Sequence, residues 1–160
     1  MSQSLPTAGR TLTVLHVDDD PMNLRVVEEI LSAFGHNAEK ASSGEEALFH
    51  LARQDFDVVL MDIHMPGMGG IETVERLRRS EAPSRHTPVI ALTADIVSRR
   101  PQEYLGLGFS DFVAKPILVS GLINAILRAA KCDNPEGQDR ISRTGRADRY
   151  TERKFLVVSF

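Results

Sequence analysis

Short apolar runs alternate with segments of helical periodicity from residue 12 to about residue 131. The runs have the length and composition of strands, whereas the segments between them repeat apolar residues at spacings of three and four. Five such strand–helix units can be counted along the chain. This alternation is typical of a parallel sheet with helices on its faces. We therefore predict an α/β fold with a doubly wound, five-stranded parallel sheet.

The third of the expected strands, at residues 56–61, is the clearest, because a nearly continuous apolar run is typical of a parallel strand covered on both faces. Signals for helix ends lie between the strands. Asp20-Pro21 suits the start of the first helix, Gly35 suits its end, and residues 43–46 have a capping-box pattern that opens the second. The other strands are expected at 12–17, about 36–41, 88–93 and within 109–115, and the last helix at about 117–131.

The 160-residue chain has the length and the hydrophobic content, 42%, of one compact domain with a core. We place this domain at residues 12–131, after a short N-terminal lead at 1–11. Residues 132–160 differ in composition, with arginines spaced among polar residues, and we interpret them as a C-terminal tail. The tail ends in an apolar run at 155–160 that can add a strand to a sheet edge, dock on the domain or stay disordered. The sequence leaves these alternatives open.

The charge distribution excludes some classes of function. The formal net charge is −3, and the segment 133–160 carries six Arg/Lys against five Asp/Glu, so the domain itself is mildly acidic. No basic surface for nucleic acid is expected. No run of about 18 apolar residues predicts a membrane span, and the N-terminus does not resemble a signal peptide. Because Cys132 is the single cysteine, we expect no intrachain disulfide and a cytoplasmic protein.

Charged and hydroxyl side chains stand where four of the expected strands end. Asp18 and Asp19 follow the first strand, Asp62 the third, Thr93 the fourth and Lys115 the fifth. The carboxyl ends of parallel strands meet at one edge of a sheet, and ligands bind there. We therefore expect these five side chains to form one site.

The chemistry of these residue types favours a metal-assisted phosphoryl transfer. Clustered carboxylates repel one another, and an oxygen-only ligand set favours magnesium. A carboxylate such as Asp62 can attack phosphorus to give an acyl phosphate, while Lys115 and the Thr93 hydroxyl hold the oxygens of the transferring group. Taken singly, each residue has a structural alternative: Asp20 and Thr93 suit helix caps, and Lys115 suits a solvated position. The combination favours a functional site.

Four motifs resemble those of the receiver domain of bacterial two-component response regulators. They are VDD at 17–19, LMDIHMPGM at 60–68, ALTA at 91–94 and AKP at 114–116. The resemblance covers about residues 12 to 131, and it implies a flavodoxin-like strand order of 2-1-3-4-5. The run at 87–94 is similar in particular to the receivers of hybrid histidine kinases and their short single-domain relatives.

The resemblance also implies a function and a role for each site residue. Asp62 would accept a phosphoryl group from a histidine kinase or a histidine phosphotransfer protein with Mg²⁺ as cofactor, and this would switch a surface that binds a downstream protein target. The resemblance further implies that the metal ligands are Asp18, Asp19, Asp62 and the backbone carbonyl of His64. Thr93 and Lys115 would bind the phosphoryl oxygens. The peptide bond Lys115-Pro116 would be cis, and Phe112 would be the aromatic residue of the switch.

Two departures from the family pattern lie next to this site. Gly69 stands where receivers usually have aspartate, so the third helix loses a capping carboxylate. Pro101 falls inside the segment that is expected to lead into or form the fourth helix, and a proline inside a helix removes a hydrogen bond and clashes with the preceding turn. We therefore expect this helix to begin late, with Pro101 in its first turn.

Two other functions are alternatives to that of a phosphoacceptor. A magnesium-dependent phosphohydrolase with an aspartyl nucleophile typically has a second acid two residues later, where this chain has His64. A degenerate receiver that acts as a scaffold would be expected to lack part of the acidic, hydroxyl and cationic set, which is complete here. We therefore expect a signalling phosphoacceptor, binding neither nucleic acid nor membrane, rather than an enzyme that turns over an outside substrate.

Overall fold

The computed structural model describes residues 10–95 and 97–132. The strands are β1 (Thr13–Val17), β2 (Asn37–Ala41), β3 (Val58–Asp62), β4 (Val89–Thr93) and β5 (Asp111–Ala114). The helices are α1 (Pro21–Ala33), α2 (Gly44–Arg53), α3 (Gly70–Arg79), the 3-10 turn η1 (Pro83–His86), α4 (Pro101–Gly106) and α5 (Val119–Cys132). The prediction of five strand–helix units is confirmed. Cys132, the first residue of the tail expected at 132–160, is the last residue of α5, and the remainder of that tail lies outside the described residues.

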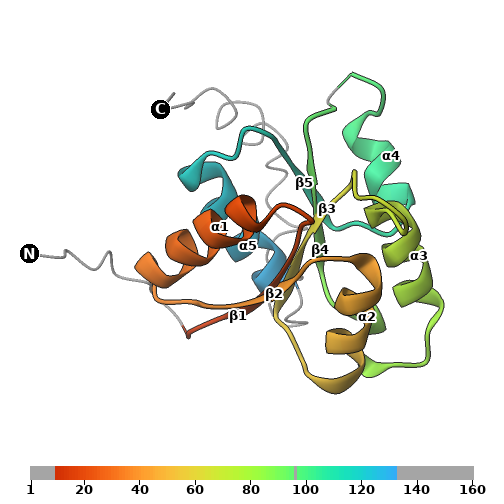
Figure 1. Cartoon of the computed structure of the whole chain (residues 1–160), viewed down its shortest axis with the longest axis horizontal. Coiled ribbons are helices and arrows are strands. Elements are labelled where there is room, and N and C mark those ends of the chain that lie inside the picture. The colour runs from red at the N-terminus through yellow and green to blue at the C-terminus, as the bar shows by residue number, and fades with distance from the viewer. Residues whose placement is uncertain (1–9, 96, 133–160) are drawn as a thin grey trace, which may run out of the picture.

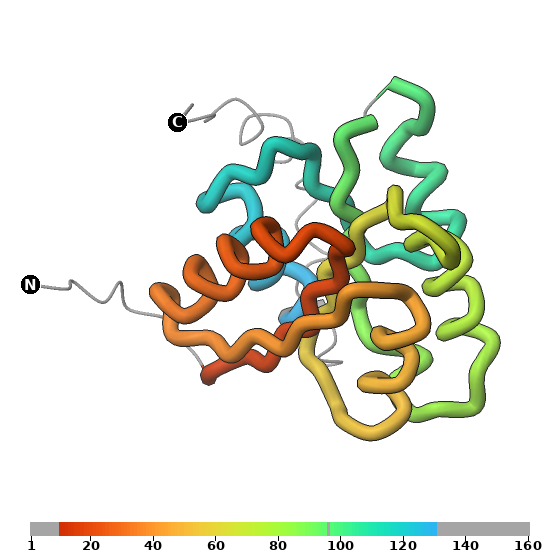
Figure 2. Tube along the Cα trace, in the orientation of Figure 1, coloured from red at the N-terminus to blue at the C-terminus, as the bar shows by residue number. Residues whose placement is uncertain are grey.

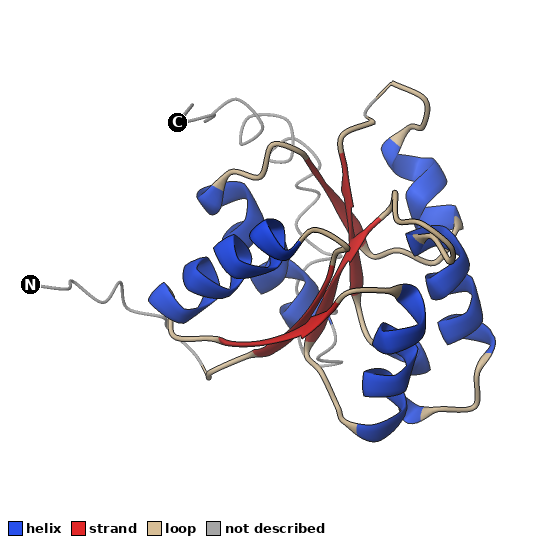
Figure 3. Cartoon of the chain, viewed as in Figure 1, coloured by secondary structure: helices blue, strands red, loops and turns tan. Residues whose placement is uncertain are grey.

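All strand pairs are parallel, and the order across the sheet is β2-β1-β3-β4-β5. Helices α1 and α5 cover one face of the sheet, and α2, α3 and α4 cover the other (Figure 1). Figure 3 shows the strands as a single layer between these two groups of helices. The chain moves outward from β1 to β2 and then returns to place β3 on the other side of β1. The strand order therefore reverses between β1 and β3, the place where open α/β sheets bind ligands.

Two apolar layers hold the sheet between its helices, because alternate side chains of a strand point to opposite faces. On one face, Leu15 and Met61 pack with the α3 side chain Leu77. On the other face, residues such as Leu60 pack against α1 and α5, where Leu31 is fully enclosed. Burying one such side chain contributes about 1.5–3 kcal/mol to folding. Among the described residues, no helix is long and apolar enough to cross a membrane.

The helix ends agree with the sequence prediction except in one detail. Asp20 caps α1 by accepting the N–H of Met22 at 2.9 Å, and Gly35 follows that helix with a positive φ of 80°. Ser43 accepts the N–H of Glu46 at 3.1 Å, as in a capping box. The Glu46 carboxylate, however, accepts the N–H and hydroxyl of Ser42, one residue earlier than the pattern predicts. The Glu46 carboxylate therefore bonds to Ser42, and not to the backbone N–H of Ser43 as a capping box predicts.

Helices α3 and α4 show the two departures from the family pattern. The N-cap of α3 is Gly69, which makes no side-chain capping bond. Helix α4 begins at Pro101, as expected, and ends at Gly106 after only six residues. Residues 94–95 and 97–100 lie between β4 and α4, and Figure 2 shows these parts of the connection extending beyond the carboxyl end of the sheet.

Candidate functional site

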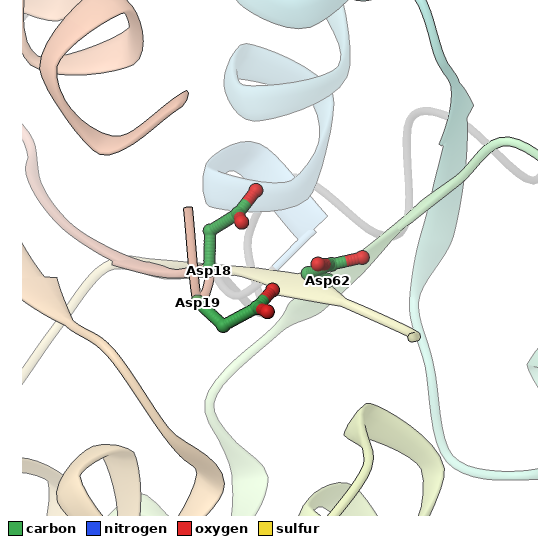
Figure 4. Close-up of side chains that lie close together, drawn as sticks. All are labelled: Asp18, Asp19 and Asp62. Atoms are coloured by element: carbon green, nitrogen blue, oxygen red, sulfur yellow. The ribbon is translucent and has the colours of Figure 1, made fainter. Parts of the chain in front are cut away.

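Three carboxylates meet where β1 and β3 end (Figure 4). Asp18 and Asp19 follow β1 directly, and Asp62 is the last residue of β3. The two strands are neighbours, with Val17 paired to Met61, so the residues at their ends lie side by side. One carboxylate oxygen from each of the three aspartates lies within 4.8 Å of the other two. This all-oxygen group can hold a hard divalent cation.

Hydrogen bonds from the start of α1 orient the buried carboxylate of Asp18. The Asp18 side chain is 1% exposed. Oδ1 accepts the backbone N–H of Asp20 at 2.9 Å, and Oδ2 accepts the side-chain amide of Asn23 at 3.1 Å. Asp20 and Asn23 lie at the start of α1, so the turn that begins this helix also fixes the carboxylate. Asp19, by contrast, is exposed to solvent.

Lys115 brings one positive charge to the three carboxylates. Its ammonium lies 3.4 Å from Asp18 Oδ2 and 3.3 Å from Asp62 Oδ1. The backbone N–H of Lys115 donates to the carbonyl of Thr93 at 2.8 Å, which ties the end of β5 to the end of β4. The peptide bond between Lys115 and Pro116 is cis.

The electrostatic balance at Asp62 favours a further positive charge. Burial is the main reason that the pKa of this carboxyl lies above its usual value; Lys115 lowers it, and the nearby charge of Asp18 raises it again. The exposed residue His64 donates its backbone N–H to Asp62 Oδ1 at 3.3 Å. One ammonium and one amide therefore compensate only part of the negative charge at this site.

Gly70 sets the position of the Asp62 backbone. It is the first residue of α3, and a Cβ at this position would overlap the carbonyl oxygen of Asp62. Only glycine allows the start of α3 to approach the end of β3 so closely. The glycines that the sequence places before α3 are therefore part of how the site is built.

Thr93 and Phe112 make their described contacts with the β4–α4 connection and with α4. Thr93 ends β4 and is buried, and its hydroxyl accepts the N–H of Asp95 at 3.0 Å and contacts the Asp95 carbonyl at 3.4 Å. Phe112 on β5 is half-buried and stacks on Tyr104 of α4, with ring centroids 6.1 Å apart and planes 13° apart. The structure thus brings Asp18, Asp19, Asp62 and Lys115 together, whereas Thr93 and Phe112 connect the site's edge to the β4–α4 connection and to α4.

His16 is a residue at the site that our sequence analysis did not single out. It lies on β1, it is fully enclosed, and its Nε2 is 3.9 Å from Asp18 Oδ2. Burial lowers the pKa of His16 to about 4; Asp18 raises it less, and Lys115 lowers it, so the ring is neutral at pH 7. A signal was present, because a polar residue interrupts the apolar run at 12–17 two positions before Asp18, and such residues share a strand face.

A five-stranded sheet of this order, with an acidic group at its reversal point and a lysine after the last strand, defines a receiver-type signalling domain. The family model of the response regulator receiver domain matches residues 14–127, and the chain belongs to this family. Signalling by phosphorelay is the function of this domain. Both the predicted family and the predicted strand order are therefore confirmed.

The similar proteins of known sequence include sensor kinases. The chain is 39% identical over 117 residues to the signal transduction histidine-protein kinase BarA of Shigella flexneri, covering 73% of this chain and 13% of BarA. It is 33% identical over 118 residues to the sensory/regulatory protein RpfC of Xanthomonas campestris, covering 73% of this chain and 16% of RpfC. The chain thus spans only a small part of the length of these relatives.

Solved structures of similar fold include a receiver domain and a chemotaxis protein. The receiver domain of sensor histidine kinase PA1611 from Pseudomonas aeruginosa PAO1, with a magnesium ion coordinated in its active-site cleft, has a TM-score of 0.68 and 30% identity, covering 76% of this chain and 98% of that one. The chemotaxis protein CheY4 of Vibrio cholerae also has a TM-score of 0.68 and 30% identity, covering 75% and 99%.

Proposed function

We propose that Asp62 is the phosphoacceptor of this receiver domain and takes a phosphoryl group from a histidine kinase or a histidine phosphotransfer protein. One observation carries the proposal. The Asp62 carboxylate lies at the carboxyl edge of the sheet, within reach of two further carboxylates and 3.3 Å from the Lys115 ammonium. A nucleophilic carboxylate, a metal-binding group and a cation for phosphoryl oxygens are the parts that this transfer needs.

The donor set fits Mg²⁺ as the cofactor. The side chains of Asp18, Asp19 and Asp62 offer only oxygen, and Mg²⁺ binds proteins through few carboxylates while retaining water. We assign the backbone carbonyl of His64 as the fourth protein ligand. Burial and, to a lesser extent, the charge of Asp18 raise the pKa of Asp62 despite the opposing effect of Lys115, and a cation beside the carboxylate would oppose this rise. When bound, the ion supplies charge neutralisation for the transferring group.

The protein's own residues then perform the transfer. An oxygen of Asp62 forms a bond to phosphorus as the bond from phosphorus to the donor histidine nitrogen breaks, which leaves an acyl phosphate on Asp62. Lys115 is already beside Asp62 and turns its N–H groups to the new phosphoryl oxygens. The Thr93 hydroxyl donates to the carbonyl of Asp95 before transfer, so it gives up this bond when it donates to the same oxygens.

This movement of Thr93 links the phosphoryl group to an output surface. If Thr93 releases Asp95, the connection between β4 and α4 loses one of its attachments to the sheet. Phe112 stacks on Tyr104, so a displacement of α4 changes the packing of Phe112 on β5. We propose that the surface over α4 and β5 binds a downstream protein target in one of these two arrangements, as a bistable element biased by a covalent charge.

The proposal also includes the class of phosphodonor and the cellular location of the protein. The sensor kinases that resemble this chain are much longer than it, so the phosphodonor is proposed by similarity to their class. We place the protein in the cytoplasm, and its single cysteine, Cys132, is in keeping with a reducing compartment. The domain changes only its own phosphorylation state and does not turn over an outside substrate.

Replacing Asp62 by asparagine tests the proposal. An amide cannot attack phosphorus as a carboxylate does, so Asp62→Asn should lose hydroxylamine-sensitive labelling from acetyl phosphate and Mg²⁺. Asp55→Asn is the matched control, because Asp55 is exposed and precedes β3 rather than ending it. Labelling should be unchanged in the control. Full labelling of Asp62→Asn would show that the acceptor is another residue.

A further inference from the structure

His16 is a buried polar side chain that the proposed transfer leaves without a role. Its imidazole is fully enclosed, and neither ring nitrogen has a hydrogen-bond partner among the described residues. Buried polar atoms of native proteins are nearly always hydrogen-bonded, so an unpaired ring in the core requires an explanation. The ring lies in the apolar layer that packs against α1 and α5, on the strand face that it shares with Asp18.

The position of the ring points to the carboxylate of Asp18. His16 Nε2 lies 3.9 Å from Asp18 Oδ2, about 1 Å longer than a hydrogen bond, so a small rotation of either side chain closes the gap. Both side chains are 1% exposed, and water therefore does not compete for either. A neutral imidazole carries one N–H donor, which suits a carboxylate acceptor.

Asp18 has a reason to need this donor. Its Oδ2 accepts from Asn23 at 3.1 Å and from Lys115 at 3.4 Å. Lys115 also contacts Asp62, and in the proposed transfer it turns to the phosphoryl oxygens. Asp18 then loses one of its donors at the moment when its orientation matters. An N–H from His16 is close enough to replace it.

We propose that His16 is a positioning residue of the metal site, whose Nε2–H donates to Asp18 Oδ2 and holds that carboxylate in the orientation a divalent cation requires. The inference rests on the proposed function, since it concerns the same ion site. Groups that hydrogen-bond to metal ligands orient them, and their removal typically costs ten- to a hundredfold in metal affinity. His16 acts through Asp18 and does not itself touch the ion.

Two variants of similar volume separate the donor from simple packing. His16→Gln places an amide N–H near the position of Nε2, whereas His16→Met fills the space without a donor. In calorimetric titrations with Mg²⁺ alone, we expect His16→Met to weaken binding about tenfold and His16→Gln to stay close to the parent protein. Urea denaturation establishes that both variants fold. Equal affinity in all three proteins would overturn the proposal, and so would an equal loss in both variants.

A second measurement needs no substitution at His16. Long-range ¹H–¹⁵N NMR of the parent protein reports the tautomer of the ring, and we expect Nε2–H with signals that shift when Mg²⁺ is added. An Nδ1–H tautomer, or signals that do not respond to Mg²⁺ binding at the site, would overturn the proposal. The proposed function fails in a different way: labelling would then persist in Asp62→Asn, whatever the behaviour of the His16 variants.

Discussion

The ammonium of Lys115 lies 3.3 Å from Oδ1 of Asp62 although the two residues end strands that are not neighbours. Lys115 follows β5, Asp62 ends β3, and β4 lies between them. The long lysine side chain spans this strand and places its charge beside the carboxylate. The contact is three-quarters buried at the lysine, whose side chain is 22% exposed, so solvent screens it only in part.

Lys115→Met should separate metal binding from phosphoryl transfer. Removal of the ammonium leaves more negative charge for a cation, so Mg²⁺ affinity should be equal to or higher than that of the parent. Labelling of Asp62 by acetyl phosphate should slow by about a hundredfold, because a charged donor to the transferring oxygens is lost. Calorimetry and labelling rates measure the two effects. A parallel loss of both would mean that Lys115 has a structural role.

Asp19→Ala should weaken Mg²⁺ binding and phosphorylation together. Asp19 is exposed, so its loss removes a metal ligand without opening the core. We expect the Mg²⁺ affinity to fall by about tenfold or more. The Mg²⁺ concentration needed for half-maximal labelling should rise by the same factor. Titrating Mg²⁺ in the labelling reaction measures this. Identical labelling rates with and without EDTA in the parent protein would contradict the metal assignment.

The connection between β4 and α4 should exchange its amide hydrogens faster than α5. Helix α4 begins only at Pro101, and the N–H groups of Val97 and Ser98 are bonded to the side chain of Asp95 rather than to a helix. Backbone with few regular bonds opens readily. Beryllofluoride with Mg²⁺, which mimics the phosphoryl group, should change exchange here more than elsewhere. If amide exchange in this connection is slow and does not change with beryllofluoride, the output surface lies elsewhere on the domain.

Arg78→Met should destabilise the fold well beyond the effect of a surface substitution. The guanidinium donates to the carbonyls of Gly108, Arg85 and Thr87 at 2.7–3.0 Å, which joins α3 to the turns before β4 and β5. We expect a loss of about 2–4 kcal/mol in the free energy of unfolding, because several charged hydrogen bonds are lost and the carbonyls remain unpaired.

The neighbouring arginine provides the control for that measurement. Arg79 is exposed, and its ion pair in the described part of the chain is with Glu75 of the same helix, at 2.9 Å. Arg79→Met should change the free energy of unfolding by no more than about 0.5 kcal/mol. Urea denaturation of both variants gives the comparison. Equal effects would show that the carbonyl contacts of Arg78 contribute little.

His36 should make the stability of the protein depend on pH. Its Nδ1 accepts the N–H of Leu12 at 3.1 Å, and burial lowers its pKa although the charge of Asp57 opposes this. The unfolded chain therefore takes up the proton first, so the stability is fully present above a pH of about 6.5 and falls as the pH drops through that value.

The variant His36→Asn isolates this effect. Asparagine can offer an acceptor oxygen near the position of Nδ1, but it does not titrate. We expect the parent protein to lose more of its free energy of unfolding than the variant between pH 7.5 and pH 5, measured by urea denaturation at each pH. Parallel pH profiles for the two proteins would show that His36 does not contribute.

Much of the fold could be read from local sequence patterns. The alternation of apolar runs and helical segments predicted all five strands, and the signals at Asp20 and Gly35 marked the ends of α1 correctly. Pro101 likewise predicted the late start of α4. These features depend on residues close together in the chain, so the local sequence is sufficient to specify them. The position of Asp62 at the end of a buried strand followed from the same pattern.

The tertiary structure decided what depends on residues far apart. The apolar pattern of a strand does not determine which strand lies beside it. The order 2-1-3-4-5 was implied only by the family resemblance, and the structure confirms it. The contact of Lys115 with Asp18 joins residues 97 positions apart. Arg78 reaches Gly108 across 30 positions, and His16 is revealed as an unpaired ring beside Asp18 only when the core is closed around it. Burial and long-range pairing arise from packing between elements, whereas the sequence by itself specifies where those elements begin, where they end and which face of each is apolar.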